Sequence, residues 1–175
     1  EVILGCVTQQ GEQAANIAKT SALRAGWPAS VAGMTINRFC SSSIDAIALA
    51  AMKVNCGQTP ALVAGGVEMM SRVPLLADGA RVFADHDFGV NHQMLLMGAG
   101  ADLIASRGEM SRADLDAVAF VSHQRALRAQ KEDRFTSIVP IATPKGLVCS
   151  DECVRPSLTP DRLATMPAVF GDLGK

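Results

Sequence analysis

Residues 36–46 read Ile-Asn-Arg-Phe-Cys-Ser-Ser-Ser-Ile-Asp-Ala, with the cysteine at position 40. The apolar segment before it, residues 31–36, predicts a buried strand, and apolar side chains at helical spacing from Ile44 to Met52 predict a helix after it. Cys40 is therefore expected at a strand-to-helix corner, where the unpaired N–H groups of the first helical turn favour thiolate over thiol. Because the same groups can hold a developing oxyanion, the segment predicts covalent acyl transfer.

A structural interpretation of Cys40 stands beside the catalytic one. A free cysteine is commonly buried and behaves as a small hydrophobic side chain. Three serines follow Cys40 at positions 41–43. They favour the catalytic interpretation, because small residues let a substrate approach the backbone and serine is a good helix N-cap.

The composition of the 175 residues limits the function classes. Hydrophobic residues make up 49% of the chain, which is enough for a folded core. The net charge is −1 and aromatic residues make up 4%, so neither a nucleic acid nor a membrane surface is an expected partner. No apolar run reaches the roughly 18 residues that a membrane span requires.

The five cysteines form an odd set without the spacing of a disulfide framework, which indicates reduced thiols in a reducing compartment. Cys149 and Cys153 are close in sequence, but the chain has no second cysteine pair and no histidine near them. Two unligated thiols, and no metal site, are therefore expected.

Strand and helix patterns alternate in the first part of the chain. Strands are predicted at residues 2–7, 31–37 and 61–65, and helices at 12–25 and 42–54. Strands joined by helices predict a mostly parallel sheet covered on both faces. Cys40 then lies at the carboxyl end of its strand, where open α/β sheets place their sites.

The pattern changes after Pro74. Residues 75–97 are irregular, and helices are predicted at 100–107 and from a cap at Ser111, with Asp114 completing a capping box, to residue 129. A strand is predicted at 135–141, which Pro140 would keep at a sheet edge. The remainder is polar and rich in turns, so residues from about 74 onward predict a separate unit.

Several segments resemble the signatures of the thiolase family. Residues 37–42, Asn-Arg-Phe-Cys-Ser-Ser, resemble the nucleophile motif, and residues 65–71 resemble the Gly-Gly-x-Glu-x-Met-Ser segment. Met97 and Gly98 stand where the family has a His-Met-Gly turn, and weaker matches follow in the same order at residues 122–126, 132–140, 151–156 and 167–170. The resemblance covers nearly the whole chain.

The resemblance implies an α/β fold with a mixed or parallel sheet, covering helices and an inserted α+β loop domain. Residues 1–73 would be the N-terminal core without its first strand, residues 74–175 an incomplete loop domain that binds CoA, and the C-terminal domain would be absent. The chain begins inside a strand and ends without a closing element, so we expect a fragment.

By resemblance, the activity is that of an acyl-CoA C-acyltransferase, with thiolysis of 3-oxoacyl-CoA or the reverse Claisen condensation. Cys40 would be the acyl-carrying nucleophile, with its backbone N–H in an oxyanion hole, and Met97 and Leu96 would lie near the pantetheine. CoA would be a substrate, and no bound cofactor is expected. The family implies a homodimer or homotetramer in fatty-acid β-oxidation, in the bacterial cytoplasm, or in mitochondria or peroxisomes of a eukaryote.

The chain also departs from the family pattern. The downstream Gly-His-Pro histidine and the second cysteine are missing, so the fragment alone is expected to have no turnover. Ser43 replaces a common glycine and is expected to cap the helix, Leu96 replaces a histidine, and Gly100 is expected to break the helix start. Glu68 is expected to bind backbone donors. A decarboxylating condensing enzyme of the ketosynthase type and a non-catalytic partial thiolase that only dimerises or binds CoA remain as alternatives.

Overall fold

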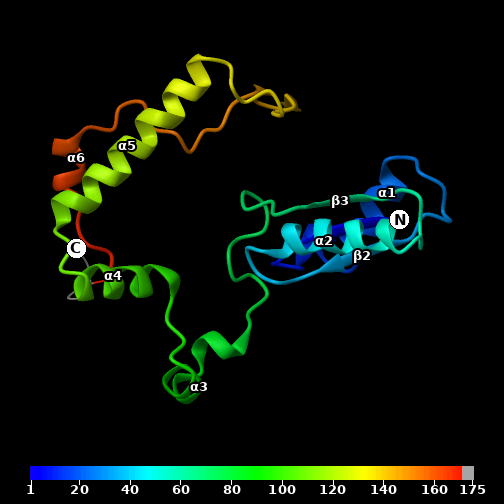
Figure 1. Ribbon diagram of the computed structural model, residues 1–175, viewed down its shortest axis with the longest axis horizontal. Coiled ribbons are helices and arrows are strands. Elements are labelled where there is room, and N and C mark those ends of the chain that lie inside the picture. The colour runs from blue at the N-terminus through cyan, green and yellow to red at the C-terminus, as the bar shows by residue number, and fades with distance from the viewer. Residues whose placement is uncertain (171–175) are drawn as a thin grey trace. The chain divides into compact units, whose positions relative to one another are not determined.

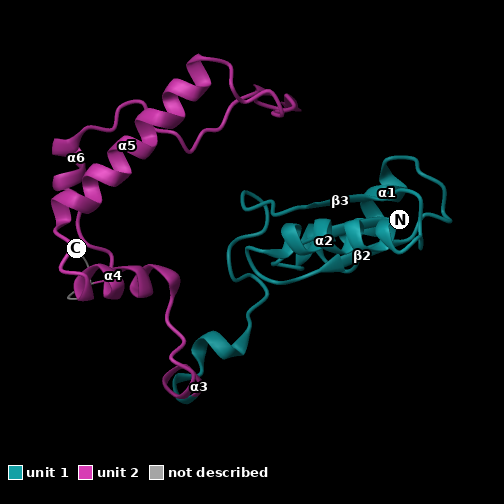
Figure 2. Ribbon diagram, in the orientation of Figure 1, with its two compact units in different colours: residues 1–87 teal, residues 88–175 magenta. Residues whose placement is uncertain are grey.

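The computed structural model describes residues 1–170 and forms two compact units (Figures 1 and 2), Glu1–Asp87 and Phe88–Lys175. The division falls C-terminal to the limit predicted at residue 74. The last five residues, with which the chain was expected to end without a closing element, lie outside the described residues.

Unit 1 is built on a three-stranded sheet in which β1 is the central strand. Both neighbours run parallel to it in the order β2-β1-β3, with Val2 opposite Gly33 on one side and Val63 on the other. The elements in chain order are β1 (Val2–Gly5), α1 (Ile17–Arg24), β2 (Gly33–Ile36), α2 (Ser42–Asn55) and β3 (Val63–Gly66). The predicted parallel sheet is confirmed, with each strand slightly shorter than expected.

The two helices cover opposite faces of this sheet (Figure 1). Val2 forms a buried cluster with Ala18 and Ala22 of α1. Gly5 lies on the other face, because successive strand residues alternate, and a Cβ on Gly5 would lie 2.6 Å from the backbone carbon of Ser42 in α2. The helix α2 therefore packs directly on the end of β1, which places the Cys40 corner at the carboxyl edge of the sheet.

The helix predicted over residues 12–25 is shorter than expected. Gly11–Gln13 form a 3-10 turn (η1), Ala15 has φ of 57°, and α1 begins after Asn16. The Asn16 side chain accepts from the N–H of Lys19 at 3.2 Å and donates to the carbonyl of Gly33 at 2.7 Å. Because this side chain caps the helix and also bonds β2, the tertiary contact fixes the helix start.

The apolar stripe that predicted α2 does not face the sheet. Ser42 and Ala46 are the buried residues of α2, whereas Ile44, Ile47 and Met52 are more than half exposed. The helical spacing predicted the element correctly, but the side of α2 that packs on the sheet is the one with small residues. Small side chains allow the close approach seen at Gly5.

After β3, the regular elements of the described residues are helices and one two-stranded hairpin. In chain order the elements are η2 (Arg81–Ala84), α3 (His86–Asn91), α4 (Met97–Arg107), α5 (Arg112–Lys131), β4 (Ile141–Thr143), β5 (Gly146–Val148) and α6 (Pro160–Ala164). The helix α3 spans the division between the units. Within unit 2, Arg112 of α5 donates to the carbonyls of Leu163 and Met166, which fastens α6 to α5.

Three expectations for the second part have definite outcomes. The capping box at Ser111 is confirmed, since its hydroxyl accepts from the N–H of Asp114 and the Asp114 carboxylate accepts from the N–H of Ser111. The prediction that Gly100 breaks a helix is wrong, because α4 begins at Met97 and runs through it; one interior glycine costs only about 1 kcal/mol. The strand predicted at 135–141 is wrong, because the chain instead forms the β4–β5 hairpin after Pro140.

Within residues 1–170, no helix is both long and apolar enough to cross a membrane.

Candidate active site

Cys40 lies between the end of β2 at Ile36 and the start of α2 at Ser42. It is a free, exposed thiol. The predicted strand-to-helix corner is therefore present, and burial as a small hydrophobic residue does not describe this cysteine. Its role as a nucleophile stays a prediction.

The corner is a tight turn. The N–H of Ser41 donates to the carbonyl of Arg38 at 3.2 Å, and the N–H of Ser42 donates to the carbonyl of Phe39 at 3.0 Å. Phe39 has φ of 49°, a left-handed conformation that non-glycine residues rarely adopt. Two of the N–H groups expected to be free for an oxyanion thus close the turn itself, which leaves fewer donors for a substrate than the sequence suggested.

Ser42 holds the turn from within. Its hydroxyl accepts from the N–H of Arg38 at 2.8 Å and donates to the carbonyl of Phe39 at 2.5 Å, and the residue is 4% exposed. The N-cap position is Ser41. The prediction that Ser43 caps the helix is wrong: Ser43 lies inside α2, and its hydroxyl occupies the space that a Cβ on Gly66 would need.

The Asn37 side chain joins the turn to the segment that follows β1. Its Oδ1 accepts from the N–H of Phe39 at 2.9 Å, and its Nδ2 donates to the carbonyl of Val7 at 3.2 Å. The side chain thus bonds both the left-handed residue next to Cys40 and the segment that follows β1.

Glu68 lies just after the end of β3, at the same edge of the sheet. Its carboxylate accepts from the N–H of Val7 at 2.9 Å, from the N–H of Thr8 at 3.3 Å and from Nε2 of Gln13 at 2.6 Å. Burial raises the pKa of Glu68, but these hydrogen bonds outweigh it and hold the pKa below its ordinary value. The expectation that Glu68 binds backbone donors is confirmed.

Gln13 was not singled out by the sequence. It is 2% exposed, donates to the carbonyl of Thr8 at 2.8 Å and accepts from the N–H of Met69 at 3.0 Å. Gln13 therefore ties the Glu68 carboxylate to the backbone of the segments that follow β1 and β3. A glutamine among polar neighbours carries no local signal of burial, so only the tertiary structure reveals it.

Cys6 provides a contrast with Cys40 at the same edge. It is 1% exposed. Burial and, secondarily, the charge of Glu68 raise the pKa of the Cys6 thiol. Of these two cysteines, Cys40 is the one that a substrate can reach.

The residues expected near CoA lie in unit 2. Leu96 is the N-cap residue of α4 and Met97 is its first residue; both side chains are exposed, Met97 to 82%. Gly98 lies against the ring of Phe170, which would clash with a Cβ at that position. Cys40 belongs to unit 1, so the two parts of the predicted site belong to different units.

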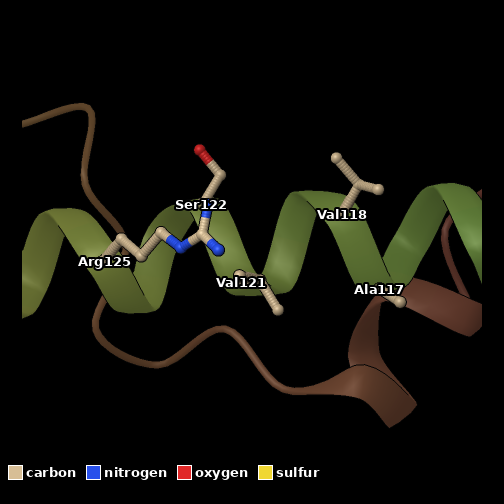
Figure 3. A pocket seen from close by; sticks show the side chains of 5 residues that line it. All are labelled: Ala117, Val118, Val121, Ser122 and Arg125. Carbon is tan, nitrogen blue, oxygen red and sulfur yellow. The ribbon is translucent and has the colours of Figure 1, made fainter.

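A shallow hollow lies along α5 in unit 2 (Figure 3). It is lined by Ala117, Val118, Val121, Ser122 and Arg125. Its lining is mostly apolar with one cationic side chain, and it does not include Cys40. On the same helix, Nδ1 of His123 accepts from the N–H of Arg155 at 3.3 Å, so this histidine fixes a loop.

Cys149 and Cys153 are free, exposed thiols. In the part of the chain that the structure describes, no group of three or more His, Cys, Asp or Glu side chains is placed to hold a metal ion.

An exposed cysteine at a helix start, at the carboxyl end of a parallel strand, is suited to act as a nucleophile. Comparison with known proteins gives the family. The family description "Thiolase, N-terminal domain" matches residues 1–175, and the chain belongs to the thiolase family.

Individual relatives of the chain are also named as thiolases. The chain is 40% identical over 192 residues to a beta-ketoadipyl-CoA thiolase of Pseudomonas aeruginosa, covering 98% of this chain and 48% of that protein. It is 36% identical over 184 residues to a 3-ketoacyl-CoA thiolase of Bacillus subtilis, covering 97% of this chain and 47% of that protein. The chain spans about half the length of these curated relatives.

Solved structures show the same fold. The Bacillus anthracis acetyl-CoA acetyltransferase superposes with a TM-score of 0.78 at 35% identity, and human mitochondrial 3-ketoacyl-CoA thiolase with 0.82 at 28% identity. Each superposition covers 99% of this chain and 48% of the other chain.

Proposed function

We propose that the protein is an acyl-CoA C-acyltransferase of the thiolase type in which Cys40 carries the acyl group. The observation that carries the proposal is the exposed Cys40 thiol just before the N-terminus of α2, on a turn stabilised by side-chain hydrogen bonds. Membership of the thiolase family supports the same chemistry. A decarboxylating condensing enzyme is less well supported, because the relatives above are named thiolases or an acetyltransferase.

The proposed reaction proceeds in two steps. The Cys40 thiolate attacks the 3-oxo carbon of a 3-oxoacyl-CoA, the bond between C2 and C3 breaks, and its electron pair takes up a proton to give acetyl-CoA. The thiol of free CoA then attacks the acyl-Cys40 thioester, which releases a shortened acyl-CoA and returns the cysteine. The backbone N–H of Cys40 is the proposed oxyanion donor. The histidine and second cysteine of the family pattern would supply the acid and base.

The second unit is the proposed CoA-binding part. The exposed Met97 and Leu96 at the start of α4 offer an apolar surface suited to the pantetheine arm. CoA enters as a substrate. Thioester exchange needs a nucleophile, an acid and base, and oxyanion donors, so the proposal includes no metal or redox cofactor.

We further propose a degradative role, with 3-oxoacyl-CoA cleaved as in β-oxidation. The relatives named 3-ketoacyl-CoA thiolase and beta-ketoadipyl-CoA thiolase support it. Five free cysteines and relatives from bacteria support a reducing compartment such as the bacterial cytoplasm. We propose a homodimer or homotetramer, as the family implies, and the outer strands β2 and β3 of the described sheet are candidates for pairing with a second copy.

The test is a thiolysis assay on the full-length polypeptide that carries these residues. A straight-chain 3-oxoacyl-CoA and 3-oxoadipyl-CoA are each incubated with CoA, and the products are separated by chromatography. We expect equal amounts of acetyl-CoA and the shortened acyl-CoA from at least one substrate, and complete loss in Cys40→Ser. Cys56→Ser is the matched control. Turnover that survives Cys40→Ser would contradict the proposal.

A further inference from the structure

We infer that Asn37 is a positioning residue that holds Phe39 in its left-handed conformation and thereby aims the Cys40 thiol. The inference rests on the proposed function, because it concerns the same nucleophile.

Phe39 has an unusual backbone conformation. Its φ of 49° is unfavourable for a residue with a Cβ, so the surrounding structure must impose it. Phe39 immediately precedes Cys40, and a rotation about its φ and ψ would redirect the Cα–Cβ bond of the cysteine. The conformation of Phe39 therefore sets where the sulfur points.

Side chains hold both peptide groups of Phe39. Its N–H donates to Oδ1 of Asn37 at 2.9 Å, and its carbonyl accepts from the hydroxyl of Ser42 at 2.5 Å. Ser42 is buried and also packs α2 against β1. Asn37 is exposed, so it stabilises the turn through its hydrogen bonds and not through buried contacts.

The Asn37 side chain is also anchored through its other polar atom. Its Nδ2 donates to the carbonyl of Val7 at 3.2 Å, and the N–H of Val7 donates to Glu68 at 2.9 Å. The segments that follow β1, β2 and β3 are thus joined through Val7, Asn37 and Glu68. Asn37 is the member of this chain of hydrogen bonds that reaches the turn.

The test uses three variants of the full-length polypeptide: Asn37→Ala, Phe39→Gly and the double variant. Glycine adopts positive φ without steric penalty, so it removes the need for Asn37. We expect Asn37→Ala to lower the kcat of thiolysis about tenfold with KM within about twofold, because misplacing a nucleophile by about 1 Å is costly. The double variant should recover to within about threefold of Phe39→Gly alone.

Asn55→Ala, an exposed asparagine at the end of α2, is the matched control. Melting temperatures measured by circular dichroism show whether each variant is folded. Asn37→Ala that keeps the wild-type kcat would overturn the inference. So would a folded double variant that stays as slow as Asn37→Ala.

A second readout separates this inference from the proposed function. Alkylation by iodoacetamide is followed at Cys40 and, in the same molecule, at the exposed Cys56. If the wild type shows no thiolysis, the proposed function fails, but Asn37→Ala is still expected to change the Cys40 rate about threefold or more relative to Cys56, with recovery in the double variant. An unchanged ratio in all variants would overturn the inference by itself.

Discussion

The carboxylate of Glu68 accepts a hydrogen bond from the N–H of Val7 at 2.9 Å. This contact joins the segments that follow β3 and β1, which lie 61 residues apart in the chain. It completes the edge of the sheet on which the Cys40 turn is built, since Val7 also accepts from Asn37.

The first prediction concerns the pH dependence of this contact. The pKa of Glu68 is lowered in the folded protein, because its hydrogen bonds outweigh its burial. A lowered folded pKa contributes stability that is fully present above the unfolded value of about 4.3 and is lost as pH falls through the folded pKa. Glu68→Gln should therefore cost about 1 kcal/mol at pH 7, a value already reduced for solvent exposure, and less in acid.

Urea unfolding of the wild type and of Glu68→Gln at pH 7 and at about pH 3 checks this prediction. The gap between the two proteins should narrow on acidification. A gap that widens instead would show that the carboxylate is not the stabilising form.

The second prediction uses two glycines on neighbouring strands. A Cβ on Gly5 would lie 2.6 Å from the Ser42 backbone, whereas a Cβ on Gly65 would meet Leu4 at an ordinary 3.7 Å. Gly5→Ala should destabilise unit 1 by about 2–3 kcal/mol, and Gly65→Ala should change stability by less than about 0.5 kcal/mol. Denaturant unfolding of the two variants measures both, and equal effects would refute the close packing of α2 on β1.

The third prediction couples Ser43 to Gly66. The Ser43 hydroxyl fills the space that a Cβ on Gly66 would need, and the carbonyl oxygen of Gly5 lies 3.0 Å from that point. Gly66→Ala should cost about 1–3 kcal/mol, and Ser43→Gly should relieve part of that cost. A double-mutant cycle is expected to give a coupling of about 1 kcal/mol, whereas simple additivity would argue against the contact.

The fourth prediction concerns the start of α5. Ser111→Ala removes the capping box and should destabilise the first turn by about 1 kcal/mol. Hydrogen exchange at the amide of Asp114, which donates to the Ser111 hydroxyl, should become about fivefold faster, as this free energy implies. Ser122→Ala, exposed in the middle of the same helix, is the control and should leave that amide unchanged.

Local sequence patterns predicted β2 and α2, the strand and helix between which Cys40 lies. The apolar runs around β1, β2 and β3 and the helical spacing after Cys40 were sufficient for a parallel sheet with the cysteine at its carboxyl edge. The start of α1 was misplaced, because Asn16 is fixed by β2 and not by its neighbours in sequence. The strand at 135–141 was wrong because an apolar run next to a proline does not distinguish a strand from an extended connection.

In the site, too, local motifs were predictable and tertiary contacts were not. Cys40 and Glu68 could be found from the sequence, because each lies in a motif. The bonds of Ser42, Gln13 and Asn37 could not be predicted, since each depends on which of several polar atoms lie together once the strand ends have met.

The most direct test of the central claim is peptide mass spectrometry of the full-length polypeptide after incubation with an acyl-CoA and a rapid acid quench. Trypsin places Cys40 in residues 39–53, Cys56 in residues 54–72 and Cys6 in the peptide that ends at Lys19, so the three cysteines are read separately. We predict an acyl mass increase on the peptide of residues 39–53 alone, reversed when free CoA is added. An adduct on either of the other two peptides, with residues 39–53 unmodified, would contradict the assignment of Cys40 as the acyl carrier.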